Sequence, residues 1–140
     1  MIRRKHKMNK KNKKFLDFYK APFYTNQTYG DYIFDKDGRP ILNINMYGSD
    51  DLNMIVKYTN MFVDIINGES MSTTIDVNEI TMPLRAENDL IFDKKDLCIG
   101  YARGWGYLTG KKNLSPVMVA DLQNEFIEKL VKDINEIYGV

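Results

Sequence analysis

Residues 31–36 read Asp-Tyr-Ile-Phe-Asp-Lys, and residues 89–94 read Asp-Leu-Ile-Phe-Asp-Lys. Each copy is typical of a β-strand that enters a turn, and a stretch with amphipathic helical periodicity follows each of them. The sequence therefore predicts two related strand-turn-strand-helix units, which form an internal repeat over about residues 21–68 and 73–140. Two hairpins in an antiparallel sheet, with two helices packed on one face, define an α+β fold class.

The hairpins differ in their turn residues. Asp37-Gly38 is a signal for a two-residue type I′ turn, whereas Lys95-Asp96 in the second copy predicts a loop that is longer or differently shaped. After that loop, residues 97–107 place apolar and aromatic side chains on one face and small residues, Gly100 among them, on the other. We expect a helix to pack closely against the small-residue face.

Two helices are indicated by apolar stripes between capping residues. The first should begin near Asp50, with Ser49 or Asp50 as its cap, and end at Gly68. The second should begin after Ser115, with Pro116 in its first turn, and end before Gly139. Between the units, residues 73–77 and 80–82 favour further strands, which Pro83 interrupts.

The charge of the chain is divided unevenly along its length. The 140 residues carry a net charge of +1, and a hydrophobic content of 44% is enough for a sizeable core. Residues 1–14 form a basic arm without an acidic residue, so residues 15–140, a single α+β domain, carry a net charge of −7. The basic residues of the arm are Arg3, Arg4, Lys5, Lys7, Lys10, Lys11, Lys13 and Lys14.

Residue types that carry catalysis are scarce. His6 and Cys98 are the only histidine and cysteine, which argues against a disulfide framework, a zinc site and a histidine-based triad. We therefore expect a non-enzymatic protein that holds neither a metal nor a cofactor. A metal-dependent nuclease is a minor alternative, and its candidate residues are Asp76, Glu79, Asp89, Asp93 and Lys95.

The glycine-rich segment before the last helix does not fit a phosphate-binding loop. Only three residues separate Gly106 from Gly110, and Lys112 stands where a Walker A loop has a hydroxyl side chain. The chain has no long apolar run and no apolar stretch behind its basic start. This pattern predicts a soluble cytoplasmic protein without a membrane contact.

Two parts of the sequence are candidates for binding. Eight positive charges in the arm could bind phosphate backbones, although a solubilising tail or a contact with the acidic body would have the same composition. A second group combines aromatic and basic side chains, which could stack on bases or anchor a protein partner. Its members are Arg103, Trp105, Tyr107, Lys111 and Lys112.

Residues 21–41, from Ala21-Pro22-Phe23 through the Asp-x-x-Gly turn of Asp35–Gly38, resemble a type of small phage and prophage protein. In that type an Ala-Pro-aromatic start leads to a short hairpin and then to one helix. Arg103-Gly104-Trp105-Gly106 before the last helix is similar to short phage proteins as well. The resemblance implies a phage accessory gene, and it supplies no functional residues.

We therefore expect a viral, phage-encoded accessory protein that binds and inhibits a host macromolecule, such as a defence protein or a nucleic-acid-processing protein. The alternative is a direct nucleic-acid-binding protein that uses the arm and the region from Arg103 to Lys112. The acidic body also permits imitation of phosphates. A homodimer is a further alternative, because long helical stripes can leave apolar surface for a second subunit.

Overall fold

A computed structural model of the chain describes residues 14–26, 31–46, 51–68 and 82–139. Within these ranges, five strands and three α-helices follow a short 3-10 helix, η2 (Lys14–Asp17). The strands are β1 (Tyr32–Phe34), β2 (Pro40–Asn43), β3 (Arg85–Glu87), β4 (Leu90–Phe92) and β5 (Cys98–Ala102). The helices are α1 (Leu52–Asn67), α2 (Tyr107–Lys111) and α3 (Pro116–Ile137).

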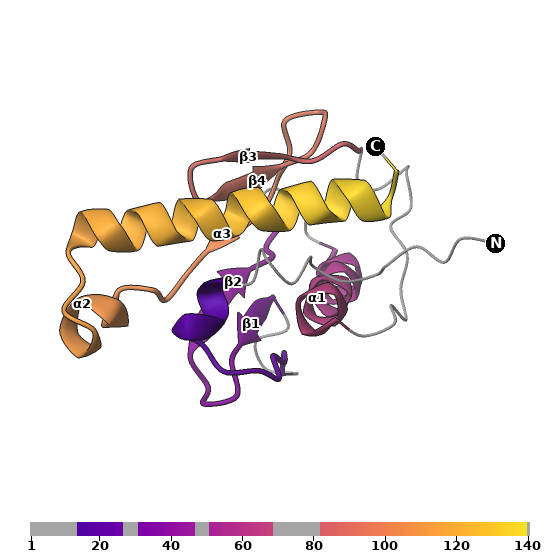
Figure 1. Cartoon of the computed structure of the whole chain (residues 1–140). Coiled ribbons are helices and arrows are strands. Elements are labelled where there is room, and N and C mark those ends of the chain that lie inside the picture. Colours follow the sequence, from indigo (N-terminus) through magenta and orange to yellow (C-terminus); the bar gives the residue numbers. More distant parts are fainter. Residues whose placement is uncertain (1–13, 27–30, 47–50, 69–81, 140) are drawn as a thin grey trace.

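The strands form one antiparallel sheet in the order β1-β2-β5-β4-β3. The two predicted hairpins, β1-β2 and β4-β5, meet at the centre of the sheet, where Leu42 pairs with Ala102 and Asn43 pairs with Tyr101. In Figure 1, α3 runs across the molecule in front of β5 and beside β3 and β4, and α1 lies close to β1. The predicted α+β class, with an antiparallel sheet and helices packed against it, is confirmed.

The turn between β1 and β2 is organised by the carboxylate of Asp35. Its Oδ1 accepts the backbone N–H groups of Asp37 at 3.0 Å and Arg39 at 2.8 Å, and its carbonyl accepts that of Gly38 at 2.9 Å. Gly38 has a φ of +83°, whereas Asp37 has no positive φ. The prediction of a type I′ turn is therefore wrong, because the left-handed Gly38 is the last residue of the turn and not one of its two central residues.

The turn between β4 and β5 has the same hydrogen bonds. Oδ1 of Asp93 accepts the N–H groups of Lys95 and Leu97 at 2.9 Å each, and Asp96 occupies the left-handed position with a φ of +66°. The prediction of a different loop shape is wrong, because Asp tolerates this conformation and the carboxylate of Asp93 fixes the rest.

A β-bulge in the second hairpin changes which side chains share a face. Phe92 pairs with Cys98 and Ile91 with Gly100, so Ile99 has no partner of its own. The bulge places Ile99 among the core side chains, whereas Tyr101 lies in the row with Asn43. The prediction that Ile99 and Tyr101 share a face is therefore wrong.

Gly100 is required by a neighbouring strand and not by a helix. A Cβ at this position would collide with the backbone oxygen of Asn43 and would lie 2.9 Å from Cδ1 of Ile44. The expected close approach exists, but its partner is β2 at the centre of the sheet. Only a glycine allows the two hairpins to pair at this distance.

The long helices end close to their predicted limits. The carboxylate of Asp51 caps α1 by accepting the N–H of Met54, so neither Ser49 nor Asp50 is the cap. Gly68 ends α1 with a φ of +75°, and Ser115 caps α3 through the N–H of Met118, as predicted. The short helix α2 was not predicted, because its five residues are too few to have a periodic pattern.

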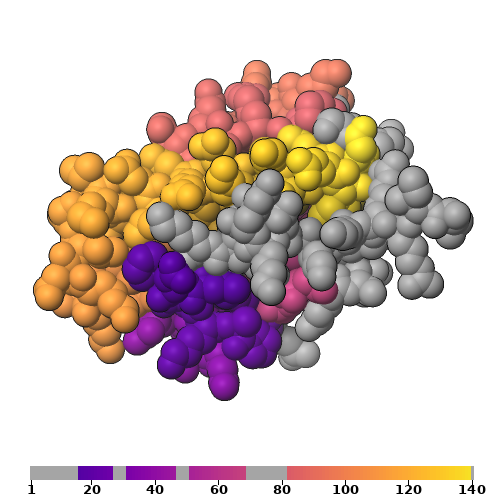
Figure 2. Space-filling model, viewed as in Figure 1, coloured from indigo at the N-terminus to yellow at the C-terminus, as the bar shows by residue number. Residues whose placement is uncertain are grey.

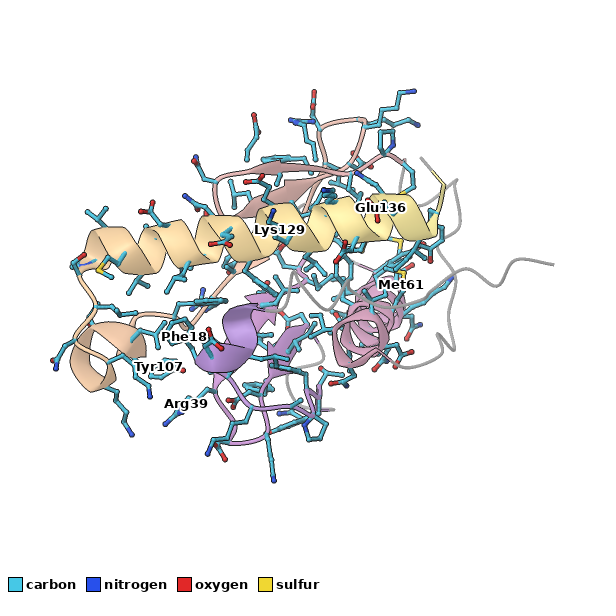
Figure 3. All side chains as sticks on the ribbon, in the orientation of Figure 1. Phe18, Arg39, Met61, Tyr107, Lys129 and Glu136 are labelled. Atoms are coloured by element: carbon cyan, nitrogen blue, oxygen red, sulfur yellow. The ribbon has the colours of Figure 1, made fainter. Side chains whose placement is uncertain are left out.

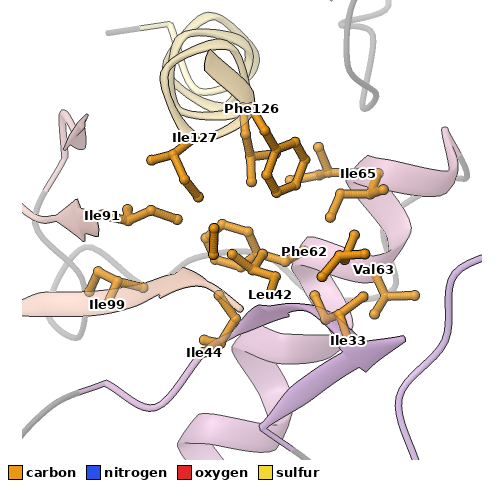
Figure 4. Close-up of a cluster of buried hydrophobic side chains, with 14 of the residues drawn as sticks. Ile33, Leu42, Ile44, Phe62, Val63, Ile65, Ile91, Ile99, Phe126 and Ile127 are labelled. Carbon is orange, nitrogen blue, oxygen red and sulfur yellow. The ribbon is translucent and has the colours of Figure 1, made fainter. Parts of the chain in front are cut away.

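The core lies between the sheet and the two long helices. Figure 4 shows α1 and α3 directing side chains toward the same cluster, which includes Phe62 from α1, Phe126 from α3 and Leu42 from β2. The apolar stripes predicted for both helices are therefore largely buried, although Leu52 at the start of α1 is 73% exposed. Little of either stripe is left exposed among the described residues, and a homodimer through these stripes stays a prediction.

Two asparagines connect the helices to the segments that precede the hairpins. The amide of Asn67 bonds both the N–H and the carbonyl of Phe23 at 2.7 Å each. The amide of Asn135 bonds both backbone groups of Leu84 at 2.8 Å each. Each buried backbone segment is therefore satisfied by a side chain and not by a strand. Of the two further strands predicted from the sequence, 73–77 lies outside the described residues, and so does 80–82 except for Met82. The next described strand, β3, begins two residues after Pro83.

Candidate functional site

The predicted aromatic and basic cluster is divided between the core and two surfaces. Trp105 is only 1% exposed, and its Nε1–H donates a hydrogen bond to the carbonyl of Ile41 at 3.0 Å. Its ring packs against those of Tyr19 and Phe126, with centroids 4.9 and 5.4 Å away. Trp105 therefore joins the two hairpins inside the core and offers no surface to a partner.

Tyr107 also has a structural contact. Its hydroxyl donates to the carbonyl of Phe18 at 2.7 Å, and the guanidinium of Arg39 lies 4.6 Å from its ring centroid (Figure 3). Burial raises the pKa of the half-buried Tyr107 hydroxyl. Tyr107 therefore holds η2 and the first hairpin against α2, and part of its ring is covered by Arg39.

Lys111 and Lys112 are exposed at the end of α2, close to the start of α3. The first turn of α3 exposes Val117 and Met118, which are 70% and 51% accessible. We call these four residues the basic corner. Figure 2 shows that α2 and the first turns of α3 form one continuous surface at one end of the molecule. Residues 104–120 contain no acidic side chain, so the corner contrasts with the acidic body.

Most of the basic arm lies outside the described residues. These residues are Arg3, Arg4, Lys5, Lys7, Lys10, Lys11 and Lys13, and Lys14 is the first residue of η2. Because η2 packs near α3, the described chain begins close to the helix that carries part of the basic corner.

The remaining member of the cluster, Arg103, lies on the sheet. Its guanidinium donates to the hydroxyl of Tyr101 at 3.0 Å and lies 5.6 Å from the ring centroid of Tyr32. The sheet register places Tyr32, Asn43, Tyr101 and Leu90 in one row on the face opposite the core side chains. Among the described residues, no helix crosses this face.

This face gathers aromatic rings and arginines that are distant in sequence. Tyr24, Phe34 and Tyr32 stack in series, with centroids 5.6 and 6.1 Å apart. Near the opposite edge of the same sheet face, Arg85 covers the ring of Phe92, and its guanidinium lies 4.8 Å from the ring centroid. We call this surface the aromatic face, and its residues are Tyr24, Tyr32, Phe34, Arg85, Phe92, Tyr101 and Arg103.

The charges on the aromatic face nearly cancel. Arg85 forms ion pairs with Asp96 and, at 3.5 Å, with Glu87. The carboxylate of Asp31 accepts a hydrogen bond from the side-chain amide of Asn43 at 3.1 Å, and its charge interacts favourably with the guanidinium of Arg103. Two guanidinium groups therefore face three carboxylates, so the face has no excess of positive charge.

Of the residues on the aromatic face, only Arg103 was predicted from the sequence to bind a partner. The alternation of Tyr32 with Phe34 and of Tyr101 with Arg103 was a usable signal for side chains pointing away from the core. The pairing of Arg85 with Phe92 could not be predicted, because β3 follows a segment without a clear pattern.

The other candidate chemistry has little structural support. Among the described residues, no group of three His, Cys, Asp or Glu side chains is arranged to hold a metal ion. Of the nuclease candidates, Asp76 and Glu79 fall outside the described part of the chain, and Asp93 bonds the backbone of its own turn. Burial raises the pKa of the Cys98 thiol, which disfavours a reactive thiolate. Within the described residues, no helix is long and apolar enough to span a bilayer.

Comparison of the chain with known protein families, with curated proteins and with solved structures gave no match.

Proposed function

We propose that this protein is a non-enzymatic binding protein, a phage accessory protein that binds a host macromolecule and blocks it. The basic corner carries the proposal. Large apolar side chains as exposed as Val117 and Met118, close in sequence to two exposed lysines, are typical of an interaction site. The matching partner has an anionic surface with apolar side chains, which is the chemistry of an acidic protein surface.

The apolar half of the corner favours a protein over a nucleic acid. A phosphate backbone is bound by positive charge alone, and Val117 and Met118 would contribute little to that contact. A host protein would bury both side chains and gain from each of them. The cytoplasm of a host cell is the compartment that this proposal implies.

Direct nucleic-acid binding is the second candidate, because Lys111 and Lys112 are exposed and the arm adds eight basic residues. Such binding would depend on these charges and would weaken steeply with salt. Trp105 would not take part, since its ring is buried.

Two paired substitutions separate the candidates. Val117→Asp with Met118→Asp should abolish capture of a host protein by the full chain, while Lys111→Ala with Lys112→Ala should weaken it less. For nucleic acid the order reverses: the lysine pair and deletion of residues 1–13 should reduce binding to random DNA or RNA in gel shifts at low salt. Host capture that survives the aspartate pair, with the fold intact by circular dichroism, would refute the basic corner as the binding site.

We also propose that the two halves of the domain are copies of one strand-turn-strand-helix unit. The hydrogen bonds of the Asp35 turn recur 58 residues later at Asp93, and the Ile44 N–H bond to the Asp31 carbonyl recurs between Ala102 and Asp89. In each half an asparagine near the end of the helix bonds the backbone of the residue after a proline. Duplication of a short coding segment explains these coincidences.

A further inference from the structure

We propose that the aromatic face is a homodimer interface, on which a second copy of this chain packs sheet against sheet around a two-fold axis. This inference concerns a surface other than the basic corner and does not depend on the proposed function. The seven residues that define the aromatic face are tyrosines, phenylalanines and arginines, which are residue types enriched at the centres of interfaces.

The distribution of charge selects the second copy as the occupant. A nucleic acid would require an excess of positive charge, but Arg85 and Arg103 face Asp31, Glu87 and Asp96. An acidic or a basic partner would leave one of these signs unmatched. A two-fold axis places the aromatic faces of both copies opposite each other in reversed orientation. The arginines of one copy can therefore meet the carboxylates of the other.

Contacts within the monomer already order the side chains of both arginines. The guanidinium of Arg103 is held by the hydroxyl of Tyr101 at 3.0 Å and lies near two rings, at 5.6 and 6.0 Å from their centroids. Arg85 is held over Phe92 by its carboxylate partners. Side chains that are already ordered lose less conformational entropy when a partner binds.

The size of the face sets the expected strength. Five strands at about 4.8 Å spacing give a width of about 24 Å, and three to five residues per strand give a length of about 10–17 Å. Two such faces bury about 500–800 Å² in total, which is below the range of about 1,200–2,000 Å² for stable complexes. We therefore expect a weak dimer, with a dissociation constant on the order of 10 µM.

Sedimentation velocity of the full chain from about 1 to about 500 µM tests the proposal, since a 10 µM dimer changes from monomer to dimer over that range. Arg103→Glu should raise the dissociation constant at least about tenfold, because it removes the guanidinium and adds a fourth carboxylate to the face. Lys132→Glu is the matched control: it makes the same charge change at an exposed position on α3 and should leave the dimer unchanged.

Tyr101→Ala provides a second test that does not depend on charge, and it should also weaken the dimer about tenfold. Its midpoint of thermal unfolding identifies any loss of fold. A wild-type chain that stays monomeric at about 500 µM would overturn the proposal, even if the face bound a host protein or single-stranded nucleic acid instead. A dimer that Arg103→Glu and Tyr101→Ala leave as strong as the wild type would overturn it equally, because its interface would lie elsewhere.

The two proposals can fail independently. Lys111→Ala with Lys112→Ala, and Val117→Asp with Met118→Asp, should leave the dissociation constant of the dimer unchanged. Arg103→Glu should reduce host binding only to the extent that a dimer binds one host molecule through both of its basic corners. Loss of the dimer with host capture retained at high concentration would therefore separate the aromatic face from the basic corner.

Discussion

Asp35 carries more of the local structure than any other polar residue of the first hairpin. Its side chain is fully buried, and its two oxygens accept the backbone N–H groups of Lys20, Asp37 and Arg39. One carboxylate thus fixes both the turn and the segment that leads into the hairpin. A buried group with this many donors is costly to remove, because each donor is left without an acceptor.

Asp35→Ala should lower the free energy of unfolding by about 2–4 kcal/mol, because three backbone donors lose their acceptor. Asp35→Asn should cost less, since its amide oxygen can still accept from Asp37 and Arg39 while the amide nitrogen faces the N–H of Lys20. Urea denaturation of both variants measures the difference. A loss below about 0.5 kcal/mol for the alanine variant would contradict this role of Asp35.

Tyr19 should make the protein sensitive to high pH. Burial raises the pKa of its hydroxyl far above the ordinary value of 10.0, and the neighbouring Tyr107 and Asp35 raise it further. In the unfolded chain the hydroxyl ionises near pH 10, whereas in the folded chain it stays neutral. The contribution of the neutral Tyr19 hydroxyl to the free energy of unfolding is therefore complete below about pH 10, and it is lost as the pH rises above that value.

Tyr19→Phe should reduce the dependence of unfolding free energy on pH above about pH 10, because it removes the ionisable group and keeps the ring. The wild-type and variant slopes are compared by urea denaturation between about pH 9 and about pH 11. Equal slopes would mean that Tyr19 ionises normally in the folded protein.

Among the elements, the β2–β5 seam determines whether the two hairpins form one sheet. The backbone of Asn43 lies so close to Gly100 that a methyl group cannot be inserted between them. At Gly104, a φ of +88° and contact with Pro40 impose a second glycine at the end of the same strand. Both glycines are needed for the contact between the hairpins, and neither is needed for the turns.

Gly100→Ala should therefore destabilise the protein by at least about 2 kcal/mol, since β2 and β5 must separate to admit the methyl group. Gly110→Ala is the matched substitution, because a Cβ there meets nothing within 4 Å and the residue lies inside α2. It should stabilise the protein by up to about 1 kcal/mol. Thermal unfolding of the two variants should shift in opposite directions, and a shift of the same sign would contradict the seam argument.

At the scale of the whole molecule, a single core connects the two halves. Trp105 follows the second hairpin, donates a hydrogen bond to Ile41 of the first, and packs against Phe126 of α3. Neither hairpin can lose its packing without exposing this ring. We therefore expect the described residues to behave as one cooperative unit and not as two independent halves.

Unfolding should accordingly be a single transition. The fluorescence of Trp105, the only tryptophan, reports the contact between the halves, and far-ultraviolet circular dichroism reports α1 and α3. Both signals should change at the same urea concentration. Separate midpoints would indicate that one half unfolds first.

Much of the local structure could be predicted from the sequence alone. The period of apolar residues defined α1 and α3, Ser115 and Gly68 marked helix ends, and the two Asp-x-x-x turns defined the hairpins. These features depend on neighbours within a few residues, so they can be read along the chain. The basic corner was found in part for the same reason, because Lys111 and Lys112 follow a glycine-rich turn.

Which side chains lie on the surface depends on contacts between distant parts of the chain. Trp105 was expected at the surface and lies in the core, because its Nε1–H finds an acceptor at Ile41, 64 residues earlier in the chain. Tyr32, Phe92 and Tyr101 share a face because β1, β4 and β5 pair in an order that local patterns do not contain. Bulges reverse the alternation at Ile99, and one residue of slip moves a side chain to the opposite face of the sheet. The aromatic face therefore exists only through contacts between residues that are distant in sequence.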